Sequence, residues 1–317
     1  PAAPASVGGK TFIKRPARPC DHWFFMPIRH LLLALAVVFV WGTNFVVIKW
    51  GLAEFPPFLL AALRFSLSAV PWIFFMPRPA VSWGRLAAFG VLLGAGQFGL
   101  LFWAMRADVT PGLASLVMQS QVFFTIGLAM LIAGERVRLA QGVAVVLAAS
   151  GVALIGWHSL HEPATSATPF GLLLLLLAAA AWAAANLVVR GAGKVNALTF
   201  MVWSSPFAVP PLLLMTLAFE GPAAIAQALT HATWLGWSAV GWQAVGNMLF
   251  GFAAWNWLLA RYPAATVTPA ALLVPVFGMG SSALVLGEPL PAWKLGAAAL
   301  VMAGLALNVW VSRRMHA

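Results

Sequence analysis

Long apolar blocks, separated by short polar connections, make up most of the chain. A helix needs roughly 20 residues to cross a hydrocarbon core of about 30 Å. Lipid offers no hydrogen-bond partner to an open backbone, and the blocks do not alternate apolar and polar residues, so helices are expected rather than strands. The pattern predicts an all-α integral membrane protein with ten transmembrane helices, at residues 31–48, 58–76, 86–105, 111–132, 139–157, 170–189, 198–219, 234–257, 264–286 and 293–312.

Two segments, 106–157 and 261–310, share a pattern. Each begins with Arg, continues with Thr-Pro, and then has two apolar stretches with a Gly-Glu pair between them. General likeness between helices rich in Ala and Leu would explain the apolar residues but not a shared register of polar and aromatic landmarks. An internal duplication is therefore predicted. The landmarks Gly134, Glu135, Gly151 and Trp157 lie 153 positions before Gly287, Glu288, Gly304 and Trp310.

The longest interruption, at residues 158–168, follows the fifth expected helix. It predicts a linker between two five-helix repeats, at residues 30–157 and 169–312. Because five is odd, the second repeat would start on the opposite side of the membrane, so the repeats are expected to be inverted. Inverted repeats are typical of carriers that bind substrate near the middle of the membrane and expose it to each side in turn.

Neither end of the chain contains a long apolar block. Residues 1–29 are basic and rich in proline, and residues 313–317 form a short tail. The first segment is expected to be a disordered tail, with Met26 a plausible natural start. No cleaved signal peptide is expected, because the segment has no apolar core of its own.

Composition indicates that lipid is the solvent. Hydrophobic residues make up 62% of the chain and charged residues 8%, whereas soluble domains carry about 25% charged residues. The net charge of +11 does not indicate nucleic-acid binding, because the basic residues stand singly between apolar blocks. The single cysteine, Cys20, excludes a disulfide framework and a thiolate metal site.

The positions of Lys and Arg predict the orientation in the membrane. With a cytoplasmic N-terminus, nearly all of them fall on the cytoplasmic side. Only Lys49, Arg106 and Lys294 fall outside. The sequence therefore predicts a multi-pass protein of the cell inner membrane with both termini in the cytoplasm.

Groups for catalysis, metal binding or proton transfer are missing from the expected spans. All Asp and Glu residues fall in connections or at span ends, and no His is central. Proton-driven carriers usually place a carboxylate or His on the path, so such coupling is disfavoured, although a group at the membrane edge stays open as a route. No HExxH, GxSxG or phosphate-binding glycine loop occurs, so we expect no enzyme, no cofactor and no ATP-driven pump.

Arg64 is the one full charge deep inside an expected span. Its burial costs about 2.5–3.5 kcal/mol on insertion scales, so a partner is expected. Guanidinium pairs well with carboxylate, which makes Arg64 a candidate substrate anchor. The alternative is that Arg64 extends toward the outer interface or binds backbone carbonyls. Lys49, at the end of the first span, is expected to anchor that helix at the interface.

Neutral amides are the polar groups that recur inside the spans, namely Asn44, Gln97, Gln119, Gln121, Asn186, Gln243, Asn247 and Asn256. An amide that faces lipid is costly, so these are expected to face other helices or a shared polar cavity. Trp41 shares a helix face with Asn44, and Trp182 shares one with Asn186, each in the first helix of a repeat. Interhelical packing is the alternative role for each. The candidate substrate-binding residues are Trp41, Asn44, Arg64, Gln97, Gln121, Trp182, Asn186 and Asn247.

Several short strings resemble the EamA family of the drug/metabolite transporter superfamily, and in character its bacterial inner-membrane exporters of cysteine and O-acetylserine. The resemblance runs over nearly the whole chain from Met26. It departs from the family in Ala183 and in the extra N-terminal tail. The strings are Trp41–Lys49, Pro56-Pro57, Leu63-Arg64-Phe65, Gly112–Leu116, Gly134-Glu135-Arg136, Arg261-Tyr262, Leu272–Val276 and Gly304–Val309.

This resemblance implies a ten-helix inverted-repeat carrier that exports amino acids or related small metabolites. Together with the uncharged spans, it leads to the hypothesis of a secondary transporter for small zwitterions such as cysteine or O-acetylserine. The expected partners are this substrate and the lipid bilayer, not nucleic acid. Export of small drugs or other metabolites is the alternative, although a cationic drug would favour a buried carboxylate.

Overall fold

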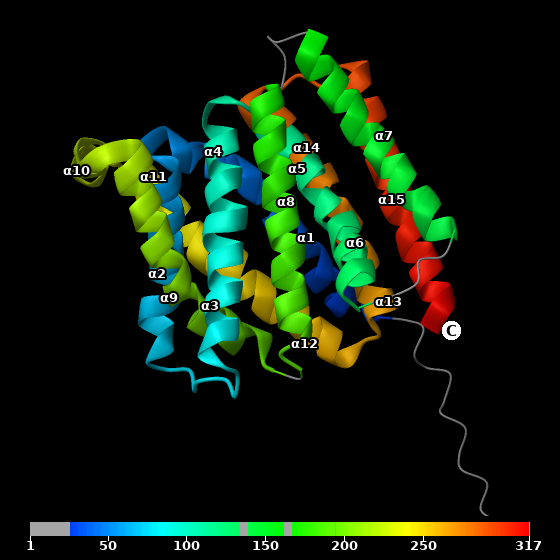
Figure 1. The fold of residues 1–317 in the computed structure, drawn as a ribbon, viewed down its shortest axis with the longest axis horizontal. Coiled ribbons are helices and arrows are strands. Elements are labelled where there is room, and N and C mark those ends of the chain that lie inside the picture. The colour runs from blue at the N-terminus through cyan, green and yellow to red at the C-terminus, as the bar shows by residue number, and fades with distance from the viewer. Residues whose placement is uncertain (1–25, 134–138, 162–166, 194, 317) are drawn as a thin grey trace, which may run out of the picture.

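The computed structural model describes residues 26–133, 139–161, 167–193 and 195–316. Apart from an isolated bridge between Val109 and Ala167, these residues form helices and their connections, which confirms the expected all-helical fold (Figure 1). The elements are α1 (Ile28–Glu54), α2 (Pro57–Ile73), α3 (Trp83–Val91), η2 (Leu92–Gly99), α4 (Leu100–Ala107), α5 (Pro111–Val117), η3 (Met118–Ser120), α6 (Gln121–Ala133), α7 (Leu139–His161), α8 (Pro169–Arg190), α9 (Ala197–Met215), η4 (Thr216–Glu220), α10 (Gly221–His231), α11 (Trp234–Gly241), η5 (Trp242–Phe250), α12 (Gly251–Arg261), α13 (Ala264–Val267), η6 (Thr268–Leu272), α14 (Leu273–Leu286) and α15 (Ala292–His316).

Length and composition make this a multi-pass membrane protein. Within the described part of the chain, eight helices are long and apolar enough to cross a membrane. The apolar helix α2 has 17 residues and is shorter. The segment from α11 through η5 to α12 is not among the eight, which we attribute to its amides and tryptophans. Each of the ten expected ranges falls on a helix, but the number of membrane crossings stays a prediction.

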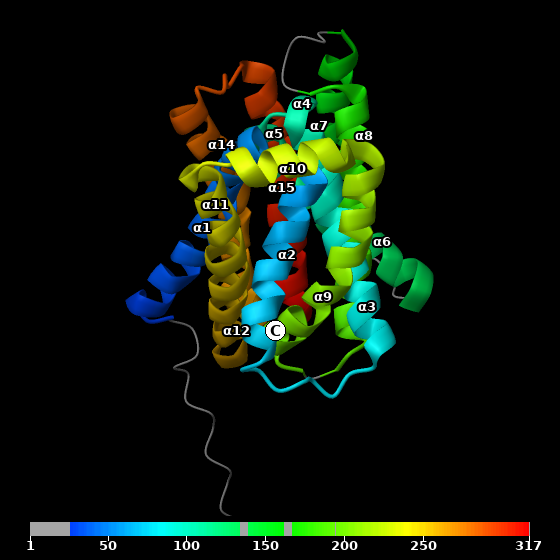
Figure 2. The same cartoon turned by 90° about the vertical axis from the view of Figure 1, so that its left-hand side faces the viewer.

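One helix was not expected. The sequence predicted only a connection near Gly221, whereas the structure places α10 there, lying across one end of the bundle (Figure 2). Gly221 has a φ of 82°, a value that suits glycine because it carries no Cβ. The chain therefore turns sharply at Gly221, between η4 and α10.

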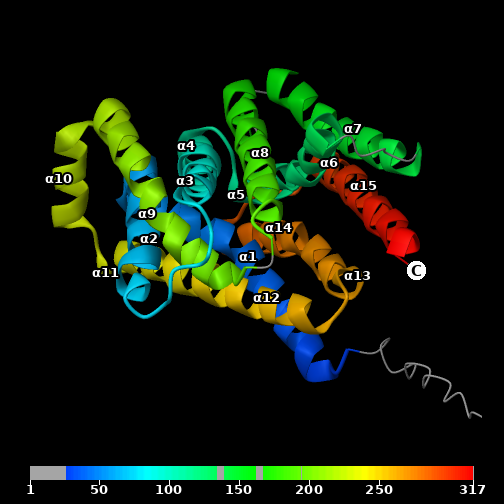
Figure 3. The ribbon, with the colours of Figure 1, turned by 60° about the horizontal axis from the view of Figure 1, so that its bottom comes forward.

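The helices α7 and α15 pack against each other at one edge of the bundle, opposite α10 (Figures 1 and 3). A Cβ on Gly151 would lie 2.8 Å from the carbonyl oxygen of Ala297, and a Cβ on Gly304 would lie 2.6 Å from that of Ala144. These close contacts pair later residues of α7 with earlier residues of α15, so the two helices run antiparallel. Ala297 follows Ala144 by 153 positions, the spacing of the internal repeat.

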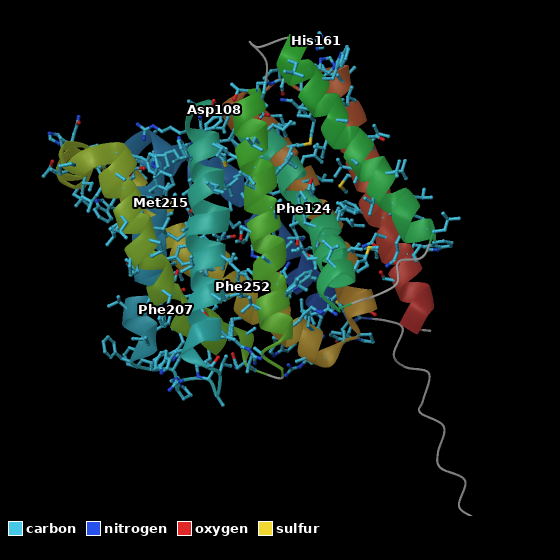
Figure 4. The ribbon with its side chains drawn as sticks, in the orientation of Figure 1. Asp108, Phe124, His161, Phe207, Met215 and Phe252 are labelled. Carbon is cyan, nitrogen blue, oxygen red and sulfur yellow. The ribbon has the colours of Figure 1, made fainter. Side chains whose placement is uncertain are left out.

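One end of the bundle, which we call the carboxylate end, holds the described acids Glu54, Asp108, Glu220 and Glu288. The helix α1 begins and α15 ends at the opposite end (Figure 1). Asp108 lies at the carboxylate end, where α4 stops (Figure 4). Each described Asp or Glu there forms hydrogen bonds between the two halves of the chain, which are the residues before 158 and those after 166. Glu54 accepts hydrogen bonds from Thr233 N–H and Oγ1 (3.0 and 2.9 Å), Glu220 from the N–H groups of Phe58 and Leu59 (2.7 and 3.3 Å), Asp108 from Thr168 Oγ1 (2.9 Å), and Glu288 from Thr110 Oγ1 and from Gly112 N–H (2.9 Å).

Candidate functional site

A cavity of about 340 Å³ lies between the two halves of the chain. Its walls come from α1, η2, α4, α5, η3 and α6 of the first half, and from α8, η5, α12, η6 and α14 of the second. The structure brings seven of the eight candidate residues together in its lining: Trp41, Asn44, Gln97, Gln121, Trp182, Asn186 and Asn247. Their role in substrate binding stays a prediction.

Direct contacts tie several of these side chains across the two halves. The Nδ2 of Asn186 on α8 donates a hydrogen bond of 3.0 Å to Oε1 of Gln121 on α6. The indole Nε1 of Trp41 on α1 donates to the backbone oxygen of Asn247 at 3.1 Å. Because both contacts cross between halves, a shift of one half against the other would alter the cavity wall.

Two lining amides keep unused hydrogen-bonding capacity. Asn44 is 3% exposed and Gln97 is 4% exposed. Neither Oδ1 of Asn44 nor Oε1 of Gln97 has a hydrogen-bond partner among the described residues. A buried polar atom without a partner costs free energy. Both amides are therefore suited to gain a polar partner when a ligand fills the cavity.

Aromatic side chains complete the wall, and most of them were not among the candidates. The ring of Trp41 lies 5.2 Å from that of Trp255 and 5.8 Å from that of Phe252, centroid to centroid. Figure 4 labels Phe252 in the lower part of the bundle. Phe45 also lines the cavity and was detectable, because Trp41, Asn44 and Phe45 follow helical spacing on one face of α1. Phe252 and Trp255 carry no comparable polar signal.

Matched helices of the two halves are π-helical where they meet the cavity. The stretch η2 contributes Gln97 and Phe98, and the stretch η5 contributes Asn247. π-helical turns are rare and occur frequently at functional sites, because the wider turn redirects side chains. No pattern in the sequence predicted either π-helical stretch.

Arg64 does not line the cavity. Its side chain is 0% exposed, so the expectation that it extends toward the interface is wrong. Its Nη1 donates to Oε1 of Gln243 at 3.4 Å, and its guanidinium carbon lies 3.6 Å from the centroid of the Phe98 ring. Phe98 in turn lines the cavity. The ring of Phe98 therefore lies between Arg64 and the cavity.

Three further polar residues occupy places that the sequence did not specify. Neither Gln243 nor Asn256 lines the cavity. Gln243 accepts a hydrogen bond from Arg64, and Nδ2 of Asn256 donates to the backbone oxygen of Phe252 at 2.7 Å. Lys49 donates to the backbone oxygens of Met105 (3.1 Å) and Arg106 (3.2 Å). Lys49 thus links α1 to the end of α4 through defined hydrogen bonds, whereas the sequence predicted only an anchor at the membrane interface.

In the described part of the chain, the lining contains amides, indoles, the Ser115 hydroxyl and apolar groups but no Asp, Glu, Lys, Arg or His. Among the described residues, no group of three or more His, Cys, Asp or Glu is arranged to hold a metal ion. A site of this kind has donors and acceptors for both poles of a dipolar molecule, because each amide supplies both. It offers no fixed countercharge to a molecule with a net charge.

Known proteins resemble this chain over most of its length. A probable amino-acid metabolite efflux pump of Salmonella typhimurium is 40% identical over 88% of this chain and 94% of its own, and one of Escherichia coli is 37% identical over the same shares. An uncharacterised transporter of Bacillus subtilis is 25% identical over 90% of this chain and 99% of its own.

A crystal structure with 20% sequence identity matches with a TM-score of 0.57, covering 92% of this chain and all of that one, which supports the fold alone. The EamA-like transporter family matches residues 28–157 and residues 169–310. The two matched segments contain every lining residue of the cavity. On these grounds, the chain belongs to the EamA-like transporter family.

Proposed function

We propose that this protein is a secondary transporter that exports small amino acids or their derivatives, such as cysteine and O-acetylserine, across the inner membrane by alternating access. The cavity is its substrate site. The indoles of Trp41 and Trp182 form its walls, and the amides of Asn44, Gln97 and Gln121, with those of Asn186 and Asn247, bind the polar ends of the substrate.

The observation that carries this proposal is the uncharged, amide-lined cavity between the two halves. A zwitterion is neutral overall, so it needs no countercharge, but its ammonium needs acceptors and its carboxylate needs donors. Amide side chains supply both. A cavity of about 340 Å³ lies at the lower end of the range for ligand pockets, about 300–1,000 Å³, which suits a small metabolite. The names of the relatives from Salmonella and Escherichia coli point to the same class.

The proposed architecture is ten transmembrane helices arranged as two inverted repeats. Its support is the pairing of α7 with α15, which are corresponding helices by the 153-residue spacing and nevertheless run antiparallel. Inverted repeats of this kind place a substrate site between the halves. The distribution of Lys and Arg supports cytoplasmic termini, with the carboxylate end facing outward.

Aromatic rings support one alternative cargo. Trp41, Phe45 and Phe98 face the cavity from the first half, and Trp182 and Phe252 face it from the second. Such rings favour flat apolar compounds, and they attract organic cations through their π faces. Export of small drugs is therefore the second candidate function, and the same assay distinguishes it.

Efflux from cells preloaded with radiolabelled cysteine or O-acetylserine tests the proposal. We expect cells that express the wild type to lose label faster than cells without the protein, and Asn44→Ala to lose this advantage at equal protein level. Asn256→Ala is the matched control, because Asn256 bonds its own helix and does not line the cavity. Equal retention with and without the protein, alongside accelerated efflux of an aromatic dye, would replace amino-acid export by drug export.

A further inference from the structure

Arg64 is a buried cation whose hydrogen bonds are incomplete. Its side chain is 0% exposed, and its Nη1 donates to Gln243 at the long donor–acceptor distance of 3.4 Å. Among the residues that the structure describes, neither Nε of Arg64 nor Nε2 of Gln243 has a hydrogen-bond partner. The rings of Phe98 and Phe65 lie 3.6 and 5.5 Å from the guanidinium carbon. Cation–π contacts of this kind compensate only part of the lost hydration.

No carboxylate among the described residues serves as a counter-ion for Arg64. The four described acids are engaged at the carboxylate end, where their hydrogen bonds hold the two halves together. A buried charge without a counter-ion is costly, and such a charge inside a membrane domain usually marks a functional site. A guanidinium can donate two parallel hydrogen bonds to one carboxylate, so a carboxylate is the best-matched partner for Arg64.

A single ring separates Arg64 from the cavity. Phe98 covers the guanidinium and also lines the cavity. It follows Gln97 in the π-helical stretch η2, and Gln97 lines the same cavity with an oxygen that has no partner. On the stretch η5, which also lines the cavity, Gln243 bonds Arg64 while Asn247, four residues later, is a lining residue. Both stretches therefore connect the cavity with Arg64, and rotation of the Phe98 ring would uncover Arg64 toward the cavity.

We propose that Arg64 and Gln243 form an inner subsite for the carboxylate of the transported amino acid, and that the Phe98 ring closes this subsite until the substrate enters. The inference rests on the proposed function and adds the orientation of the substrate in its site. The carboxylate binds behind Phe98, and the ammonium stays among the amides and indoles of the cavity. Cargo selection then depends on the carboxylate rather than on the side chain alone.

Counterflow into proteoliposomes of the purified full-length protein tests this with two probes, L-cysteine and cysteamine, which keeps the thiol and the ammonium but lacks the carboxylate. We expect the wild type to take up cysteine about ten- to hundredfold better, the value of hydrogen bonds to a charged group. In Gln243→Glu, the new carboxylate occupies Arg64, so cysteine uptake should fall by a similar factor while cysteamine uptake persists. Gln227→Glu is the matched control, because Gln227 is exposed on α10, and should behave as the wild type.

The possible outcomes separate the two proposals. Equal uptake of cysteine and cysteamine by the wild type would overturn the subsite and leave amino-acid transport standing. Uptake of neither compound would overturn the proposed function and the subsite with it. Full cysteine uptake by folded, monodisperse Gln243→Glu would also refute the subsite, since a fixed carboxylate beside Arg64 must compete with the substrate.

A separate measurement tests the closing role of Phe98. Phenylglyoxal modifies accessible arginines, and mass spectrometry of the Arg64 peptide reports its rate at that residue. We expect Phe98→Ala to raise this rate at least about tenfold, and O-acetylserine, which has no thiol to consume the reagent, to protect Arg64. Phe45→Ala enlarges the same cavity without uncovering Arg64 and should leave the rate unchanged. Equal rates in all three proteins would show that Phe98 does not close the subsite.

Discussion

The pair formed by Glu288 and Lys294 provides the sharpest stability test of this fold. Lys294 is 0% exposed, and its Nζ lies 2.9 Å from Oε1 of Glu288 and 2.9 Å from the backbone oxygen of Pro289. Glu288 also accepts from Thr110 Oγ1 and from the N–H of Gly112. In Glu288→Gln, the buried ammonium loses its counter-ion, and the new amide offers one acceptor oxygen instead of two to three donors, which are Lys294 Nζ, Thr110 Oγ1 and the N–H of Gly112. Removing one partner of a buried ion pair costs about 3–5 kcal/mol.

The expected loss in unfolding free energy is therefore about 3–5 kcal/mol for Glu288→Gln, measured by SDS titration in mixed micelles. Lys294→Met should cost less, because Glu288 would keep both donors from the start of α5. The double variant should be more stable than Glu288→Gln alone, since it no longer contains a buried unpaired charge. Glu54→Gln is the control: its contacts with Thr233 are exposed and worth about 1 kcal/mol. A loss in Glu288→Gln no larger than this control would refute the reasoning.

Two further changes test the packing and the polar wall. Gly90→Ala should lower the unfolding free energy by about 1–3 kcal/mol, because a Cβ there would lie 2.1 Å from the carbonyl oxygen of Ser204. Gly84→Ala, with no atom within 4 Å of its new Cβ, should be neutral or slightly stabilising, and equal losses would contradict the close contact between α3 and α9. A double-mutant cycle of Gln121→Leu and Asn186→Leu in the same titration should give a coupling of about 0.6 kcal/mol, and zero coupling would contradict their hydrogen bond.

Sequence predicted the polar part of the cavity well because the solvent is lipid. An amide inside a span has few favourable places, and Asn44, Gln97 and Asn247 all lie in the cavity lining as the pattern indicated. The aromatic part was mostly missed for the same reason. Phe252 and Trp255 are as stable facing lipid as facing a cavity, so their positions in the sequence do not reveal their direction.

Other features depend on contacts between distant residues. The sequence left Arg64 as a substrate anchor or as a residue that meets the interface or backbone carbonyls. It did not identify the partner Gln243, which lies 179 positions away on another helix. No local pattern identifies such a pairing. The start of α10 was read as a turn because Gly221 precedes a proline. Proline at the first position of a helix is equally common, and the positive φ of Gly221 supplies the turn before it.

The carboxylate end bears directly on how the cavity would open. Any separation of the halves there breaks the contacts of Glu54, Asp108, Glu220 and Glu288. Separation differs from deleting one partner, because both sides of each contact gain water, so each contact is worth only about 1 kcal/mol net. The four carboxylates accept seven such hydrogen bonds across the two halves, which at about 0.5–1.5 kcal/mol each amount to roughly 4–10 kcal/mol. This is the same order as the roughly 5.5 kcal/mol that a 10⁴-fold difference in ligand affinity between two states supplies. Under the proposed alternating access, contacts of this strength would hold this end together and still allow a bound substrate to shift the balance between two states.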